Sequence, residues 1–366
     1  MRTIHTSCLM TIAALALATS CGKSDTPTAA SGPVDVRLVV SSGNNTRVGS
    51  DETDNDIRQL RVYAFNADGE KVGYAEADSL QGQNYIPITL SEGGDINFYV
   101  IANDNFGPKP VTDWTLLSKT DLESLKFDLS GFTGWSTTGD FVSPMSNNRY
   151  DEFGNDLKND SGTAAYENDY GTAVNVTKPT TGTLVIPVTV QHVLGRLRLM
   201  LNKESDDVTI TLKRAAVYNR PDYFLLYNSG SAGIEYEKNE SLVNESLVDE
   251  FVVSDIPLET TQKEVARTYL APNLYGSSDP DTYTAQKTDG TTSSNGLNEA
   301  YRLELTVEFA YSTGKETKNY TVYLPRVPRN TSIDVQGTFK GTVVKPEFNV
   351  MTEAWEEKEM NIPAFQ

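Results

Sequence analysis

Residues 302–309 read Arg-Leu-Glu-Leu-Thr-Val-Glu-Phe, so every second side chain is apolar. This period of two is typical of a β-strand that buries one face. The turn residues Ser312-Thr313-Gly314 follow, and a second alternating run passes through Tyr320, Val322 and Leu324. The two runs predict a half-buried antiparallel hairpin in the last quarter of the chain.

The same alternation recurs upstream and predicts further half-buried antiparallel strands. Their apolar positions are Val34/Val36/Leu38/Val40, Leu60/Val62/Ala64, the run 96–102, Leu184/Ile186/Val188/Val190, Leu197/Leu199/Leu201 and Val208/Ile210/Leu212. Helix signals are sparse: Thr120-Asp121-Leu122-Glu123 has capping-box spacing and predicts one short helix over 119–126. The run 191–201 also fits helical spacing, but we favour a strand from about Arg196. Many short strands separated by turns predict an all-β chain built from β-sandwiches, with a few short helices.

Length and composition restrict the class of protein. The 366 residues suffice for about two domains, and a hydrophobic content of 38% is too high for wholesale disorder. The formal charge of −19 argues against nucleic acid or an anionic membrane surface as a partner. Because both cysteines, Cys8 and Cys21, lie in the first 21 residues, we expect no disulfide framework in the body of the protein.

The N-terminal segment is typical of an export signal. Arg2 precedes an apolar stretch from Cys8 to Leu17, and small residues then lead to Cys21. The stretch is well short of the roughly 20 residues that a transmembrane helix needs. Small residues that end at a cysteine resemble the bacterial lipobox, so we expect residues 1–20 to be a signal peptide and Cys21 to be lipidated. The alternative is an ordinary signal peptide, cleaved nearby, that leaves a free thiol.

The residue inventory gives little support to catalysis. His192 is the one histidine after the export signal, which excludes metal sites built from several histidines and cysteines and also a Cys/His pair. Neither a Gly-x-Ser-x-Gly nucleophile motif nor a phosphate-binding glycine loop occurs. The acidic turn 151–156 lacks the alternating ligand spacing of a calcium loop and is interpreted as solvated surface. We therefore expect His192 to be structural. We also expect no enzyme activity, no cofactor and no metal site. A secreted hydrolase ranks third, behind the two hypotheses developed below.

Aromatic residues in expected loops suggest a second hypothesis for the function, the binding of glycans. Tyr and Trp side chains stack on sugar rings, so a surface glycan-binding lipoprotein is the main competing hypothesis; otherwise these rings cover the edges of the core. The residues concerned are Trp135, Tyr150, Tyr166 and Tyr170. Most belong to a polar stretch, 147–180, that precedes an expected boundary near residue 185, and 277–298 is a second polar loop.

The C-terminal end holds two further amphipathic strand candidates. The first alternates through Phe348, Val350, Thr352 and Ala354. After Trp355 and a charged segment, the second contains Met360, Ile362 and Phe365. Together with the strand at 34–40, they give the chain strand-forming segments at both ends.

Four stretches, spread over nearly the whole chain, carry a family resemblance. They are the lipobox with Val36-Arg37-Leu38-Val39-Val40 and Thr46-Arg47-Val48; Ile57–Phe65 with Asp68-Gly69 and Phe98–Asn103; His192–Leu199; and Val327–Val335 with the tail that ends in Ile362-Pro363-Ala364-Phe365. In this order and combination they resemble the fimbrillin family, the subunits of the type V pili of Bacteroidales. The resemblance implies two tandem β-sandwich domains of transthyretin-like topology and export as a lipoprotein.

The resemblance also implies proteolytic processing after an arginine behind the first strand. Here the cut would fall between Arg47 and Val48, in a polar loop of the kind in which a protease can bind extended backbone. Arg37 lies inside the predicted strand, and Arg58 leads directly into the next one. The expected organisation is a signal peptide at 1–20, a lipidated propeptide at 21–47, domains at 48–185 and 186–345, and a donor-strand tail at 346–366.

What the family resemblance finally implies is assembly by donor-strand exchange. Loss of the strand that carries Val34, Val36, Leu38 and Val40 would expose an apolar groove, and the tail of another molecule would fill it. Because donor and acceptor are different surfaces, the contact propagates head to tail. The implied partners are other copies and related pilins, an arginine-specific protease, and the outer membrane through the lipid before cleavage. The implied location is the outer membrane and then an extracellular adhesive fimbrium; a tip or anchor subunit is the alternative within the family.

Processing would also change the charge. Residues 1–47 carry four basic and two acidic side chains, so the remaining chain has a net charge of −21 and no cysteine. Such acidity should keep free subunits soluble.

Overall fold

The computed structural model is nearly all β in the residues that it describes, as the sequence predicts. These residues are 32–42, 57–80, 83, 85–104, 113–129, 142–148, 169–221, 223–227, 248–273, 301–325, 327–341, 346 and 348–354. Several expected functional residues lie outside them: Cys21, Arg47, Val48, Trp135, Tyr150, Tyr166, Trp355, Met360, Ile362 and Phe365. None of the helices in the described ranges combines the length and apolarity needed to cross a membrane.

The first half of the chain forms one eight-stranded sheet that folds over a core. Its strand order is β3-β2-β5-β7-β9-β1-β4, with β8 beside β5. The strands are β1 (Val34–Ser42), β2 (Leu60–Phe65), β3 (Lys71–Ala77), β4 (Tyr85–Leu90), β5 (Gly94–Ala102), β7 (Met145–Ser146), β8 (Val174–Val176) and β9 (Leu184–His192). Most of β9 pairs with β1, and its last two residues pair with β7. The layers β4-β1-β9 and β3-β2-β5 thereby enclose an apolar core.

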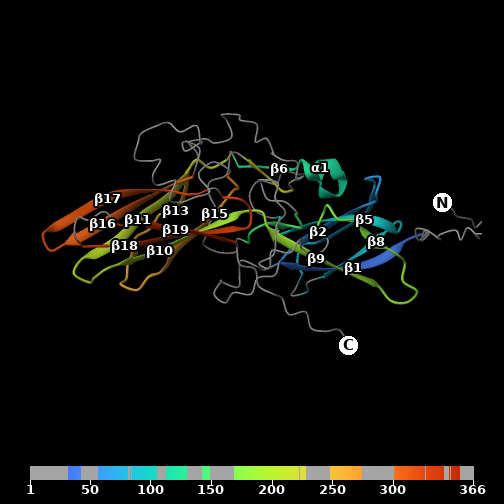
Figure 1. Cartoon of the computed structure of the whole chain (residues 1–366), viewed down its shortest axis with the longest axis horizontal. Coiled ribbons are helices and arrows are strands. Elements are labelled where there is room, and N and C mark those ends of the chain that lie inside the picture. The colour runs from blue at the N-terminus through green and yellow to red at the C-terminus, as the bar shows by residue number, and fades with distance from the viewer. Residues whose placement is uncertain are drawn as a thin grey trace, which may run out of the picture.

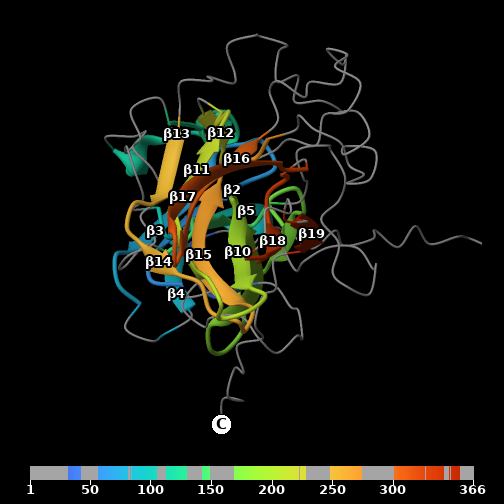
Figure 2. The ribbon, with the colours of Figure 1, turned by 90° about the vertical axis from the view of Figure 1, so that its left-hand side faces the viewer.

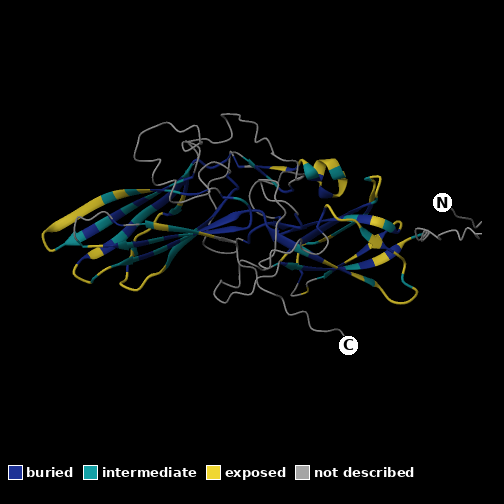
Figure 3. Cartoon of the chain, in the orientation of Figure 1, coloured by how far each residue is buried: buried dark blue, intermediate teal, exposed yellow. Residues whose placement is uncertain are grey.

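The second half forms a sandwich of two sheets. Their orders are β15-β10-β18-β19, seen side by side in Figure 2, and β13-β11-β16-β17, with β14 beside β11. The strands are β10 (Gly195–Lys203), β11 (Thr209–Tyr218), β13 (Val248–Val252), β14 (Ile256–Pro257), β15 (Lys263–Leu270), β16 (Arg302–Tyr311), β17 (Gly314–Tyr323), β18 (Thr331–Phe339) and β19 (Phe348–Ala354). The alternating residues of β10, β11 and β16 fill the core between the sheets. The two halves lie at opposite ends of an elongated molecule (Figure 1), and the buried residues run along its length (Figure 3).

Two expectations need correction. The expected boundary between residues 185 and 186 falls inside β9, which belongs to the first sheet as far as His192. The strands are also not all antiparallel, because β1 runs parallel to β9 and β10 runs parallel to β18. Alternation reports which face of a strand is buried and carries no information on strand direction, which depends on the connections between strands.

The predicted short helix is confirmed as α1 (Lys119–Glu123), although its cap differs. Ser118 is the N-cap, and its hydroxyl and the carboxylate of Asp121 form the capping box. The box thus begins two residues before the expected Thr120. The run 191–201 is extended, as favoured, since it contains the end of β9 and most of β10.

A third core joins the two halves. Strand β6 (Lys126–Asp128) pairs with β12 (Tyr223–Leu225), although about one hundred residues separate them. The rings of Phe127 and Phe224 stack there at 5.0 Å. This junction core is an aromatic-rich cluster, and its members come from both halves of the sequence: Tyr63, Phe65, Tyr99, Phe127, Val193, Phe224, Tyr227 and Tyr269, among others.

Buried polar contacts hold the segment 223–227 in the junction core. The Tyr227 hydroxyl donates to the carbonyl of Val100 at 3.0 Å. The guanidinium of Arg329, which is 2% exposed, donates to the carbonyls of Leu225 and Leu226 at 3.1 and 3.0 Å. Because these bonds connect elements far apart in sequence, they stabilise the arrangement of the two halves.

Candidate assembly site

Strand β1 occupies the middle of its layer. It pairs antiparallel with β4 over Val34–Val39 and parallel with β9 over Val36–Ser42. The four residues expected to be buried are 0–1% exposed and belong to the first core: Val34, Val36, Leu38 and Val40. The structure therefore brings this set together as the sequence predicts.

The outward face of β1 is also held in place. The Thr89 hydroxyl donates to the Asp35 carboxylate at 2.7 Å, and the guanidinium of Arg37 lies 4.6 Å from the centre of the Tyr85 ring. Arg37 lies within the strand, as predicted, opposite Pro87 and Val185. Its backbone is thus part of two ladders and is a poor protease substrate.

Removal of β1 would leave a specific vacancy. At roughly 1.5–3 kcal/mol for each buried Val or Leu, the four inward side chains contribute about 6–12 kcal/mol of transfer free energy. The strands β4 and β9 would each lose a full ladder of backbone hydrogen bonds. A strand that supplies four apolar side chains at a period of two would restore both the apolar contacts and the backbone hydrogen bonds.

The first expected donor segment forms the last strand of the second half. Strand β19 pairs antiparallel with β18 over its whole length. The Phe348 ring lies 5.9 Å from Phe339 and 6.0 Å from Tyr320, and Val350 also packs against the second core. Phe348, Val350 and the exposed Thr352 therefore already have a place in their own subunit.

Gly337 controls the fit of β19. It lies opposite Phe348, and a Cβ atom at Gly337 would lie 2.8 Å from that ring. We expect Gly337→Ala to displace the start of β19 and to lower the free energy of unfolding in urea by about 1–3 kcal/mol. Hydrogen exchange should accelerate at residues 348–351. The control Thr317→Ala, a truncation at an exposed position of β17 in the other sheet, should leave exchange in β19 unchanged; equal exchange in both variants would contradict this role of Gly337.

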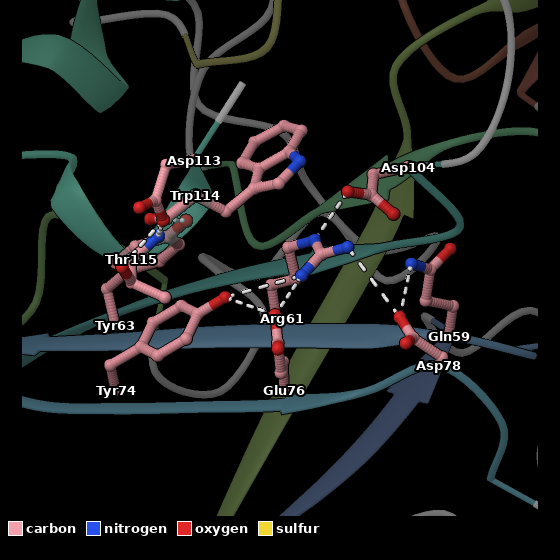
Figure 4. Close-up of polar contacts among 10 residues, drawn as sticks. All are labelled: Gln59, Arg61, Tyr63, Tyr74, Glu76, Asp78, Asp104, Asp113, Trp114 and Thr115. Atoms are coloured by element: carbon pink, nitrogen blue, oxygen red, sulfur yellow. Dashed lines mark hydrogen bonds and ion pairs between the residues drawn. The ribbon is translucent and has the colours of Figure 1, made fainter. Parts of the chain in front are cut away.

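A buried polar cluster lies on the other layer of the first half (Figure 4), and the sequence gives no clear signal for it. Arg61 of β2 donates to the Asp104 carboxylate at 2.5 Å and also bonds Glu76. Its guanidinium lies 5.2 Å from the Trp114 ring, in the short helix η2 (Trp114–Leu116). The one hint in the sequence is a charged residue, Arg61, within a predicted apolar strand. In the structure all six residues of that strand, Leu60–Phe65, are buried.

The electrostatics of this cluster favour a structural role. Burial alone would lower the pKa of Arg61, but hydrogen bonds to Asp104 and Tyr74 outweigh burial and raise it. Burial and the bond to Glu76 raise the pKa of Tyr74 to about 12. Arg61 therefore stays charged and Tyr74 stays neutral at physiological pH. The cluster holds β2, β3, the segment that follows β5 and η2 together, and it supplies no group for proton transfer.

The remaining candidates are core residues. His192 is fully buried, and burial, assisted by the charge of Arg196, lowers its pKa well below 6.5, so the imidazole is neutral at pH 7. Tyr170, expected in a loop, is 6% exposed and packs 5.3 Å from Tyr99 and 5.2 Å from Tyr227. Its ring is thus part of the junction core and has no face for a sugar.

The family model for the major fimbrial subunit protein (FimA) matches residues 33–214, which contain β1 to β10 and the start of β11. No curated protein matches the sequence.

Solved structures share the fold at low sequence identity. A candidate cell adhesion protein from Bacteroides eggerthii aligns with a TM-score of 0.54 and 13% identity over 90% of this chain and 98% of its own. One from Parabacteroides distasonis has a TM-score of 0.51 and 11% identity over 92% and 100% of the chains. The C-terminally truncated tip fimbrial protein Mfa3 from Porphyromonas gingivalis has a TM-score of 0.50 and 12% identity over 88% and 100%.

Proposed function

The chain belongs to the fimbrillin family, and on that premise we propose that it is a stalk subunit of a cell-surface adhesive fimbria that polymerises head to tail by donor-strand exchange. The subunit is a structural protein and performs no catalysis. The observation that carries the proposal is the position of β1, a strand near the N-terminus that is fully buried on its inward face and paired on both sides.

The proposed route begins with export and lipidation at Cys21. An arginine-specific protease then cuts between Arg47 and Val48, which separates β1 and the lipid from the rest of the subunit. Because β1 lies between β4 and β9, its departure opens an acceptor slot with two unpaired strand edges and an apolar floor. The subunit moves from the outer membrane to the fimbrium once its slot receives a donor strand.

The proposed donor is the C-terminal tail of another copy, within Phe348–Phe365. Two segments of this tail compete. Residues 348–354 have the same period of two as β1, over seven residues against nine, but as β19 they cover one side of β18 in their own subunit. Residues 355–365 carry Met360, Ile362 and Phe365, but a proline at 363 lacks the N–H that a central strand uses.

The test uses a soluble precursor that begins at Gly22 and an arginine-specific protease. We expect cleavage after Arg47 to produce ladders that resist SDS without boiling. Arg47→Ala should stay monomeric under the same treatment, and Arg58→Ala should behave as wild type. A ladder from Arg47→Ala, or none from wild type after complete cleavage, would refute the proposed route.

Two tail deletions distinguish the donor segments and the position in the fimbria. If the donor lies in 355–365, removal of 355–366 abolishes the ladder; if β19 is the donor, only removal of 348–366 does so. A cleaved subunit that lacks its own donor segment should still accept the tail of a subunit that keeps it. The polymer should end at that point. Unchanged polymerisation after the larger deletion would exclude a stalk role, because a stalk subunit must donate as well as accept.

A further inference from the structure

Arg58 offers a second peptide bond to an arginine-specific protease, eleven residues after Arg47. Among the arginines of the described ranges, it is the one that is exposed and lies outside the strands. Its side chain therefore presents the group that such a protease reads. Whether the bond is cut then depends on the backbone, since a protease binds its substrate as extended chain whose polar groups are accessible.

The backbone on both sides of the Arg58–Gln59 bond is held in place. The Arg58 N–H donates to the side-chain oxygen Oδ1 of Asn103 at 2.9 Å, and the Asn103 N–H donates to the Gln59 carbonyl at 3.1 Å. The Arg58 carbonyl, which is the group that a protease attacks, accepts from the Leu80 N–H at 3.1 Å. The groups that a protease would bind are thus already paired within the subunit.

The conformation of Asn103 favours these contacts. It follows the last residue of β5, is 1% exposed and has a φ of 57°, a left-handed conformation that asparagine tolerates better than most residues. Its Nδ2 donates to the carbonyl of Ser143 at 3.3 Å, which fixes the direction of Oδ1. We call the bonds from Asn103 to Arg58 and Gln59 the Asn103 clamp.

Cleavage after Arg58 would damage the mature subunit, although it would also release β1. It would remove Ile57, which packs against the first core. It would also place a charged amino group on Gln59, which is 8% exposed, and burial of an unpaired charge is costly. A cut after Arg47 keeps Ile57 and leaves the Arg58–Gln59 peptide bond intact.

From these contacts we propose that Asn103 is a specificity-determining residue of processing. The Asn103 clamp directs an arginine-specific protease away from Arg58 and to the Arg47–Val48 bond. A clamped bond is cut only while its segment is locally open, so the rate of cleavage after Arg58 follows the population of the open form. The inference rests on the proposed function, since processing after Arg47 is part of it.

The experiment treats the soluble precursor that begins at Gly22 with an arginine-specific protease and follows the fragments by intact mass over time. Asn103→Gly suits the left-handed conformation and removes the side-chain bonds to Arg58 and Ser143. Asn330→Gly is the matched control, because Asn330 has a φ of 54° and its Oδ1 makes no hydrogen bond within the described residues. Circular dichroism and urea unfolding verify that both variants are folded.

We expect wild type and Asn330→Gly to yield the fragment that begins at Val48 and to resist cleavage after Arg58. In Asn103→Gly the fragment that begins at Gln59 should form at least about tenfold faster, because a hydrogen bond that closes the segment is lost. Adding Arg58→Ala to Asn103→Gly should remove this fragment and keep the one that begins at Val48. A folded Asn103→Gly that forms the Gln59 fragment at the wild-type rate, or an equal gain in Asn330→Gly, would overturn the inference.

Hydrogen exchange in wild type tests the Asn103 clamp without any substitution, which covers the case that Asn103→Gly fails to fold. The amide hydrogen of Arg58 should exchange at least about tenfold more slowly than in an unstructured peptide, because Asn103 accepts it. Exchange at the unprotected rate would overturn the inference.

The result is separable from that of the proposed function, because it compares the cleavage of two bonds and does not depend on polymerisation. If wild type cut after Arg47 forms no SDS-resistant ladder while Asn103→Gly gains the Gln59 fragment, the proposed route is wrong and the role of Asn103 holds. If wild type polymerises and Asn103→Gly is cut after Arg58 no faster than wild type, the route holds and the role of Asn103 is wrong.

Discussion

Replacing Leu38 with aspartate should make the uncut precursor assemble without a protease. Leu38 is 0% exposed and lies opposite Ile86 and Ile186, so the new carboxylate enters an apolar core. Loss of the leucine together with burial of a charge should weaken the docking of β1 by at least about 3 kcal/mol. A loosened β1 exposes the slot, and SDS-resistant ladders should then form from precursor that carries an intact 47–48 bond.

Two controls make this result specific. Asp35→Asn changes the same strand on its exposed outer face and should leave the precursor monomeric. Leu38→Asp combined with deletion of 348–366 should lose the ladder, because no donor remains. A Leu38→Asp precursor that stays monomeric, or that forms aggregates regardless of the tail, would contradict the idea that β1 is what keeps the slot closed.

Truncating Tyr227 to alanine should destabilise the whole molecule and uncouple its halves. The side chain is 1% exposed, packs 5.1 Å from Tyr99, and donates its hydroxyl hydrogen to the Val100 carbonyl. Removal of a buried aromatic ring costs about 3–5 kcal/mol. Because the ring ties the segment 223–227 to β5 of the first half, calorimetry should show two separated transitions where wild type shows one.

The conservative variant separates packing from hydrogen bonding. Tyr227→Phe keeps the ring and loses only the hydroxyl, so the free energy of unfolding should fall by about 1–2 kcal/mol and the single transition should persist. Leu116→Ala, a truncation of a side chain that is 75% exposed, should change neither quantity. If Tyr227→Ala unfolded in one transition with the stability of wild type, the junction core would not couple the two halves.

Alternation in the sequence was sufficient for most of the fold. Strands with a clean period of two, such as 34–40 and 302–309, appear as β1 and β16 with the expected residues buried. The capping signal also located α1 within two residues. These features depend on near neighbours in the chain, which is the information that a single sequence displays directly.

Features that depend on distant pairing were not accessible in the same way. The parallel pairing of β1 with β9 joins segments about 150 residues apart, and alternation is the same for either direction. Strand β12 gives only a three-residue signal, yet it completes the junction core through β6 and Arg329. Tyr170 lies in a turn, as its polar surroundings predict, but its burial depends on Tyr99 and Tyr227, which come from distant parts of the chain.

The candidate site shows the same division. The buried set of β1 followed from its sequence, and the assignment of Arg47 and the tail came from a family resemblance. What the sequence could not reveal is that β4 and β9 lie on either side of β1, because this depends on pairing between distant segments. Similarly, Arg61 became part of a cluster only when β3, the end of β5 and η2 came together.

The most direct test of the central claim is the N-terminal sequence and intact mass of the subunit recovered from assembled fimbriae. If assembly requires loss of β1, the polymerised subunit begins at Val48 and carries no lipid and no residue of Val34–Ser42. A polymerised subunit that begins at a lipidated Cys21, with β1 still attached, would contradict the account.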